Sequence, residues 1–287
     1  MKTRLTMKAS KRFIFAALLV LLPGACVFIQ EQEKDTLPAE KEELNPPETT
    51  GDSVSLWLKI KPVCPFEYKI GRVDYFLYQE RLIGHFTSTI EEPLEIKVEK
   101  GLEVQKLYAL TNGFGEYNEQ ALWHHDIFKD LIMDIRDERK GYPFMSGVLD
   151  ISGDYKDTVE VEIRALSSEI RIRSVSNLST DYSLLENPRI YIRNAYPRAR
   201  PFSPTNYSSS GEYYDTEREF LSQDIGIYSL YPDMKLYTYP NDIPETELSP
   251  GTELVMEYEK EGRTYEKSWS LYPLERNSLV ILDLDIR

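Results

Sequence analysis

Apolar and polar residues alternate with a period of two along much of the chain after residue 52. Successive side chains of a strand point to opposite faces of its sheet, so this pattern predicts strands with one buried face. The connections between the strands are rich in Pro, Gly, Asn and Asp, as β-turns require. The predicted strands cover residues 53–61, 71–79, 94–100, 104–111, 158–175, 189–193, 235–239, 252–259, 263–269 and 278–287.

The first strand shows the alternation most clearly. Its apolar face carries Val54, Leu56, Leu58 and Ile60, and the intervening residues are polar except for Trp57. We expect the four aliphatic side chains to lie in a hydrophobic core.

The stretch from residue 158 to residue 175 is much longer than an ordinary strand. It runs for eighteen residues, against about five or six in a typical strand. We therefore expect it to bend or to serve two sheets in succession.

One segment, Asn118 to Arg139, has the periodicity of a helix. It places apolar residues near one face, Asn118 suits the N-cap position, and Gly141 and Pro143 would end the helix. One helix among many short strands predicts a mostly β chain built of β-sandwiches, and not alternating βα units. The apolar face would carry Leu122, Ile127, Leu131, Ile132 and Ile135.

The N-terminus has the pattern of an export signal. Residues 1–12 carry five cations and no acid, and Phe13 to Leu22 is an unbroken apolar run of ten residues. A helix needs about 20 such residues to span a bilayer, so a cleaved signal fits better than a membrane anchor. Residues 22–26 resemble a lipobox, which predicts a lipid on Cys26. The alternative is an ordinary signal peptide cut after Ala25.

Composition divides the remainder into a tether and a folded body. Residues 26–52 are rich in Glu and Pro and hold too little apolar surface to fold, which is typical of a flexible tether. The body is long enough for two domains, which we place at 53–166 and 167–287 after a signal peptide at 1–25.

The net charge limits the classes of partner that the chain can bind. The formal net charge is −14, and loss of the five N-terminal cations changes it to −19. Such a body repels nucleic acid and anionic lipid, because affinity for either comes mainly from Lys and Arg. We therefore expect membrane contact through the lipid alone.

No catalytic or metal-binding motif stands out. The two cysteines, Cys26 and Cys64, cannot form a disulfide framework once the first carries a lipid. His124 and His125 diverge by about 100° on a helix and do not face one ligand. The nucleophile elbow, the phosphate-binding loop and the zinc-protease motif are all missing from the sequence. We expect neither a cofactor nor a metal, and no enzymatic activity.

Tyrosine is the most prominent residue type of the C-terminal half. Most of these residues are ordinary strand residues, but the loop at 198–216 combines Tyr, Ser, Asn and Gly as adaptable recognition loops do. Its cations would attract an anionic partner against the acidic background. The candidate binding residues are Arg198, Arg200, Tyr207, Tyr213 and Tyr214.

The order of several motifs resembles that of the Bacteroidales fimbrillins, the subunits of type V pili. FMSG at 144–147 and the strand after it resemble the passage from the first domain of that family to the second. The resemblance covers almost the whole chain by order and spacing. The other motifs are the lipobox, the tether, strand 53–61, residues 72–78, KLYALTNG at 106–113, LYTYPND at 236–242 and LERNSLVILDLDI at 274–286.

The resemblance implies two tandem transthyretin-like β-sandwich domains, with one helix inserted in the first, and an adhesive or structural role at the outer membrane and cell surface. In the family, a protease removes the segment through the first strand, and a strand from a neighbouring subunit fills the groove. Here the departing strand would be 53–63, and Val54, Leu56, Leu58 and Ile60 would fill the groove before it leaves.

Two departures from the family leave the type of subunit open. The family's cut follows a basic residue, and here Lys61, Lys69 and Arg72 are the candidates in a short connection that contains two prolines. An uncut subunit would be an anchor. The chain also stops directly after its last strand, without a donor tail, which favours a tip-like or accessory subunit.

A second hypothesis comes from a different class of function. The chain could be a monomeric outer-membrane lipoprotein that binds glycans, and a host protein or glycan is also a potential ligand of an adhesive subunit. This hypothesis predicts an exposed aromatic platform that includes Tyr213 and Tyr214.

Overall fold

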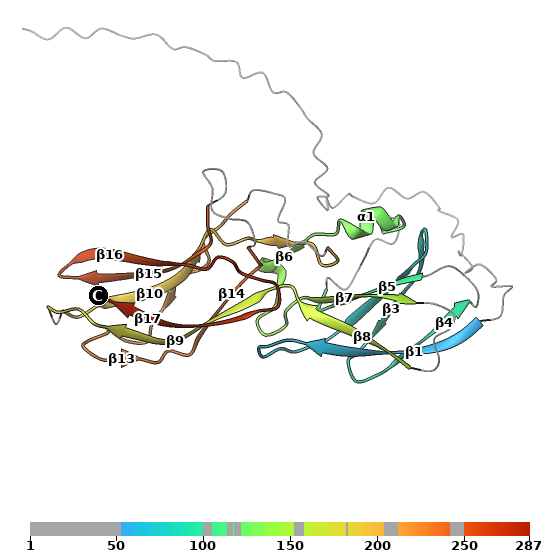
Figure 1. Cartoon of the computed structure of the whole chain (residues 1–287), viewed down its shortest axis with the longest axis horizontal. Coiled ribbons are helices and arrows are strands. Elements are labelled where there is room, and N and C mark those ends of the chain that lie inside the picture. The colour runs from blue at the N-terminus through green and yellow to red at the C-terminus, as the bar shows by residue number, and fades with distance from the viewer. Residues whose placement is uncertain are drawn as a thin grey trace, which may run out of the picture. The chain divides into compact units, whose positions relative to one another are not determined.

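The computed structural model describes residues 53–99, 105–113, 117, 122–151, 158–181, 183–203, 212–241 and 250–287. These residues are mostly in strands (Figure 1). The predicted signal peptide, the tether, Cys26 and Tyr207 lie outside the described residues. No helix in the described part of the chain is long and apolar enough to cross a membrane.

The N-terminal strands form one seven-stranded sheet in the order β3-β2-β5-β7-β8-β1-β4. Neighbours in this sheet are antiparallel, except that β1 and β8 run parallel. The strands are β1 Ser53–Val63, β2 Val73–Tyr78, β3 Leu82–Ser88, β4 Leu94–Glu99, β5 Gln105–Thr111, β7 Met145–Ile151 and β8 Thr158–Ala165.

Two four-stranded arrangements follow along the chain. The first has the order β12-β10-β15-β16, and in the second β9 pairs with β13, β14 and, in parallel, β17. The strands are β9 Ser168–Asn177, β10 Glu186–Arg193, β12 Glu219–Phe220, β13 Ser229–Leu230, β14 Met234–Thr238, β15 Glu253–Lys260, β16 Arg263–Ser270 and β17 Leu279–Ile286. The short strands β6 Met133–Asp134 and β11 Arg198–Ala199 pair with each other.

The long predicted strand at 158–175 serves two sheets, as expected. Its first part is β8 in the seven-stranded sheet, and its second part is β9 in a different sheet. Leu166 and Ser167 are both buried at the break, and Leu166 donates its backbone N–H to the Phe144 carbonyl at 2.8 Å.

The long predicted helix is wrong over the described residues. Its place is taken by the short helix α1, His125–Lys129, then by β6 and a single 3₁₀ turn, η1, at Ile135–Asp137. Two residues of the predicted apolar face, Ile127 and Ile132, are 56% and 46% exposed. Tertiary pairing overrides the helical periodicity, because β6 needs extended backbone to bond to β11.

Three hydrophobic clusters fill the interior. One lies among β1, β2, β4, β5, β7 and β8, and a second lies among β9, β10, β14, β15 and β17. The third cluster combines Phe76 and Phe128 from the N-terminal half of the chain with Tyr196 and Tyr239 from the C-terminal half. Residues Thr49–Arg287 form one compact unit, so the division into domains at residue 166 stays a prediction.

Candidate functional site

Strand β1 lies inside the seven-stranded sheet, between two other strands. Residues Ser53–Leu58 pair with β4, and residues Trp57–Val63 pair with β8. The first part of β1 is therefore bonded to β4 and the second part to β8, and both edges are paired at Trp57 and Leu58. Removal of β1 would leave a slot with unpaired backbone groups along β4 and β8, which is the kind of edge to which another chain adds a strand.

The inward face of β1 is the one that the sequence predicts. Leu56, Leu58 and Ile60 are 1%, 0% and 6% exposed, and Val54 packs partly buried against the same cluster. Trp57 on the opposite face is 44% exposed. Burial of one such aliphatic side chain stabilises a fold by about 1.5–3 kcal/mol, so β1 contributes much of the core of this sheet.

The connection from β1 to β2 is held by hydrogen bonds to distant backbone. Asn112 organises it: its side-chain oxygen accepts from the Gly71 N–H at 3.0 Å, and its amide donates to the Lys69 carbonyl at 3.0 Å and the Pro143 carbonyl at 2.9 Å. The Lys69 N–H also donates to the Gly141 carbonyl at 2.8 Å. A protease that cuts here would first have to open this local structure, because it needs extended backbone.

The three candidate processing residues lie in different settings. Lys61 belongs to β1 itself and faces Glu160 at 3.7 Å. Lys69 is exposed on the connection between β1 and β2. Arg72 is half-buried and pairs with the buried Asp74 at 2.8 Å. Lys69 is thus the exposed one of the two candidates that follow β1.

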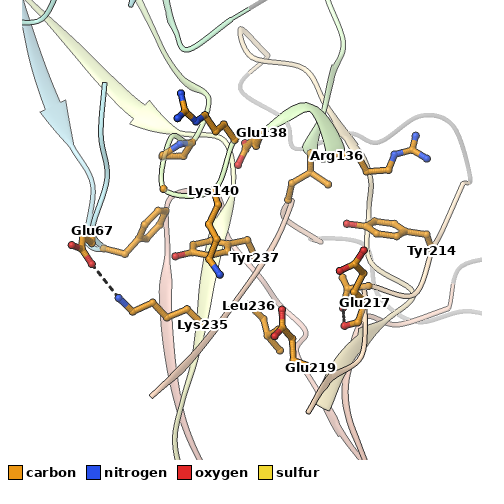
Figure 2. A pocket seen from close by; sticks show the side chains of 16 residues that line it. Glu67, Arg136, Glu138, Lys140, Tyr214, Glu217, Glu219, Lys235, Leu236 and Tyr237 are labelled. Atoms are coloured by element: carbon orange, nitrogen blue, oxygen red, sulfur yellow. Dashed lines mark hydrogen bonds and ion pairs between the residues drawn. The ribbon is translucent and has the colours of Figure 1, made fainter. Parts of the chain in front are cut away.

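A cavity of about 410 Å³ lies beside this connection. Its lining comes from the connection, from η1 and the residues after it, from the segment before β12 and from β14. Figure 2 shows Glu67 and Lys235 on one side of it, joined by an ion pair of 3.1 Å, and Tyr214 and Glu217 on the other. Tyr237 lies between them and contributes an aromatic face.

The carboxyl group of Glu138 is enclosed in the wall of this cavity, although the residue is partly exposed. It accepts hydrogen bonds from the Phe144 N–H and the Ser167 hydroxyl, both at 3.3 Å. Among the ion pairs of the described residues none involves Glu138. Burial therefore raises the pKa of Glu138 from 4.5 to about 8, since the charged form loses its hydration.

The titration of Glu138 predicts a stability that falls as pH rises. The stabilising contribution of the protonated carboxyl is complete below about pH 4.5 and is lost as pH rises through about 8. We expect the free energy of unfolding of the wild type to fall by an amount on the order of a few kcal/mol between pH 5 and 9. Glu138→Gln should abolish this fall. Urea unfolding at several pH values measures it. Glu219→Gln, at an exposed acid of the same cavity, is the control; curves for Glu138→Gln and wild type that run parallel would contradict the prediction.

The arginines of the predicted binding loop are engaged with acids of this chain. Arg198 pairs with Glu212 at 3.0 Å and with Asp134 at 3.6 Å, and Arg200 pairs with Asp130 at 3.2 Å. Their charges are thus largely neutralised before any partner arrives. The binding role of this loop stays a prediction.

The tyrosines of that loop pack against the body. The Tyr213 ring lies 5.1 Å from the Tyr196 ring, edge to face. Tyr214 exchanges backbone hydrogen bonds with Ala195 at 2.8 and 3.2 Å, and burial raises the pKa of its hydroxyl to about 12. Both side chains are half-buried, which is not the geometry of an exposed aromatic platform.

The described residues include one ordered histidine–aspartate pair. His85 Nε2 lies 3.2 Å from Asp74 Oδ1, and the His85 ring stacks on Phe76 with centroids 4.5 Å apart. The same carboxylate oxygen also pairs with Arg72. Among the described residues, Asp74 provides the side-chain hydrogen bond to the His85 ring, and the Tyr117 ring packs edge to face against it with centroids 5.4 Å apart.

His125 and Cys64 are both half-buried. His125 bonds to the Tyr108 hydroxyl, and burial lowers the pKa of its imidazole. Cys64 is a free, half-buried thiol whose pKa is raised by burial. No group of three or more potential metal ligands occurs in the part of the chain that the structure describes.

Solved structures share this architecture. A candidate cell adhesion protein from Bacteroides eggerthii DSM 20697 matches with a TM-score of 0.60 at 13% identity, over 82% of this chain and 87% of the other. A fimbrilin from Porphyromonas gingivalis W83 matches with a TM-score of 0.59 at 10% identity, over 75% of this chain and 80% of the other. The chain has the fold of a fimbrillin.

A third solved structure also shares this architecture. It is a candidate cell adhesion protein from Parabacteroides distasonis ATCC 8503, with a TM-score of 0.55 at 11% identity, over 81% of this chain and 88% of the other. No protein-family model and no curated protein matches the sequence. The similarity to the fimbrilin fold therefore appears in three dimensions at a sequence identity of 10%.

Proposed function

We propose that this chain is a non-enzymatic cell-surface subunit for adhesion or pilus assembly, with two transthyretin-like sandwiches. The three solved structures support it, because one is a fimbrilin and two are candidate cell adhesion proteins. The N-terminal pattern supports export as a lipoprotein of the outer membrane, with Cys26 as the lipidated residue and the lipid as the membrane contact.

The observation that carries the proposal is the setting of β1. It is the first described strand, it pairs on both edges, and it places Leu56, Leu58 and Ile60 in the core. A strand from another subunit with the same alternation would regain the backbone hydrogen bonds and the buried aliphatic surface together. We therefore propose that fimbrillin subunits are the partners and that β-strand addition at the β1 position is the mode of assembly.

The subunit type depends on whether the connection after β1 is cut. A cut releases β1 and suits a tip-like or accessory subunit, whereas an intact connection keeps Cys26 joined to the body and suits an anchor. Analysis of the N-terminus of protein extracted from the cell surface distinguishes them. A diacylated Cys26 identifies the anchor form, and an N-terminus after Val63 identifies the cut form. A signal peptide cut after Ala25 with an unmodified Cys26 would contradict the lipoprotein proposal.

Strand addition is tested with a cleavable version of the full chain. A recognition sequence for a specific protease, inserted between Lys69 and Ile70, allows the purified protein to be nicked. We expect a fluorescent peptide of residues 53–69 in excess to replace the nicked segment, with a rise in fluorescence anisotropy. The un-nicked protein is the control and should not bind the peptide. Equal anisotropy with nicked and un-nicked protein would contradict assembly by strand addition.

The glycan-binding alternative gains no support from the site. Tyr213 and Tyr214 are half-buried and packed against the protein body. We retain glycans and host proteins as ligands to be tested for an adhesive subunit, for example on a glycan array, with Tyr213→Ala as the informative variant.

A further inference from the structure

The residues that follow β1 make specific contacts of their own. Phe66 is 5% exposed, and its ring meets the Tyr237 ring edge to face with centroids 6.1 Å apart. The Glu67 carboxylate lies 3.1 Å from the Lys235 ammonium. Both partners belong to β14, which does not pair with any strand of the seven-stranded sheet. The connection therefore contacts a surface outside the sheet that receives β1.

The side chain of Tyr237 on β14 is held by contacts that do not involve the connection. The Tyr237 hydroxyl donates to Glu169 at 3.0 Å, and the fully buried Glu169 is itself paired with Arg171. These contacts hold the Tyr237 ring in place whether or not Phe66 lies against it. Lys235 has Glu67 as its one ion-pair partner among the described residues. The surface thus offers a fixed aromatic ring with a cation beside it.

The two contacts differ in what they contribute. Phe66 adds buried aromatic area, which contributes to affinity. The Glu67–Lys235 pair is largely exposed, with 78% of the Glu67 side chain accessible, and an exposed pair adds little stability. The main effect of the ion pair is on specificity, because a strand with a cation in place of Glu67 would be repelled by Lys235.

We propose that Tyr237 and Lys235 form a second recognition site for whichever strand occupies the β1 position. This inference rests on the proposed strand addition. The occupant is an extended polypeptide that runs parallel to β8 and carries alternating apolar residues. It also carries an aromatic residue and then an acid, six and seven positions after the last buried aliphatic residue, as Phe66 and Glu67 follow Ile60.

The position of the cavity agrees with this role. Phe66, Glu67, Lys235 and Tyr237 all line the 410 Å³ cavity (Figure 2). When the connection leaves with β1, the cavity loses the wall that Phe66 and Glu67 provide. An incoming strand of eleven residues that matched β1 alone would fill the slot in the sheet and leave Tyr237 and Lys235 uncovered.

The test uses the nicked full chain and a set of peptides. The wild-type peptide 53–69 is compared with peptide 53–63 and with peptide 53–69 carrying Phe66→Ala, Glu67→Lys or, as the control, Lys59→Ala on the outward face. We expect Phe66→Ala to weaken binding about a hundredfold or more. We expect Glu67→Lys to weaken it about fivefold, and the protein variant Lys235→Glu to restore binding of that peptide. The control should bind like wild type.

The outcomes separate this inference from the function on which it rests. If peptide 53–63 binds as tightly as peptide 53–69, strand addition holds and the second recognition site is wrong. The same conclusion follows if Lys235→Glu fails to reverse the preference between Glu67 and Lys at this position. If no peptide binds the nicked protein, strand addition itself is wrong, and the second recognition site is wrong with it.

Discussion

Replacement of Leu58 by alanine is expected to lower the free energy of unfolding by about 2–5 kcal/mol. Leu58 is fully buried in the middle of β1 and packs in the cluster that also holds Leu56 and Ile60. Alanine would remove the buried methine and both methyl groups of the leucine and leave a cavity, because the flanking strands β4 and β8 prevent collapse of the sheet. Urea denaturation followed by tryptophan fluorescence measures the loss.

Lys59 provides the matched control in the same strand. Its side chain is on the outward face and exposed, so Lys59→Ala should change the free energy of unfolding by no more than about 0.5 kcal/mol. Equal effects of the two substitutions would show that β1 does not hold its inward face in the core. The proposed slot for a partner strand would then have no hydrophobic basis.

Replacement of Arg276 by alanine is expected to cost about 3 kcal/mol or more. Its guanidinium donates to the Ser146 hydroxyl at 2.7 Å and to the carbonyls of Pro201 and Ala165 at 3.0 and 3.1 Å. These acceptors come from three distant parts of the chain, and the substitution would remove the donor that joins them, leaving the Pro201 carbonyl with the Ser146 hydroxyl as its donor. Burial lowers the pKa of Arg276 to about 10, since no carboxylate compensates the lost hydration of the guanidinium.

Arg263 serves as the control for this substitution. It is exposed at the start of β16, and Arg263→Ala should change the free energy of unfolding by no more than about 0.5 kcal/mol. Arg276→Lys should be intermediate, because an ammonium can reach fewer of the acceptors than the planar guanidinium. An Arg276→Ala protein as stable as wild type would mean that these hydrogen bonds contribute nothing net.

Several elements could be predicted because their signal is local. The alternation in β1 defines both a strand and its buried face. The length of the stretch at 158–175 indicates that it contributes a strand to each of two sheets. The strands β3 and β7 lack such a pattern. Gly147 in β7 illustrates why: a Cβ there would lie 2.0 Å from the Glu162 carbonyl oxygen, a constraint that comes from a neighbouring strand.

The failed helix at 118–139 has the same origin. Its apolar spacing is helical, yet Met133 and Ile135 are buried in other ways because the backbone around them bonds to residues 197–199. A local pattern cannot report a competing partner that lies more than sixty residues away. Propensity is therefore a weak guide wherever a short segment pairs with a distant one.

The sequence by itself determined the β class of this chain and the inward face of its first strand, because each depends on neighbouring residues. The export signal at the N-terminus lies outside the described residues and stays a prediction. The tertiary structure alone decided the environment of Glu138, the acceptors that surround Arg276 and the contacts of Phe66 and Glu67 with β14. Charge burial and contact between distant segments depend on how the sheets pack, and no spacing along the chain encodes them. The strand could be predicted from its alternation, whereas the surface that selects its replacement required the fold.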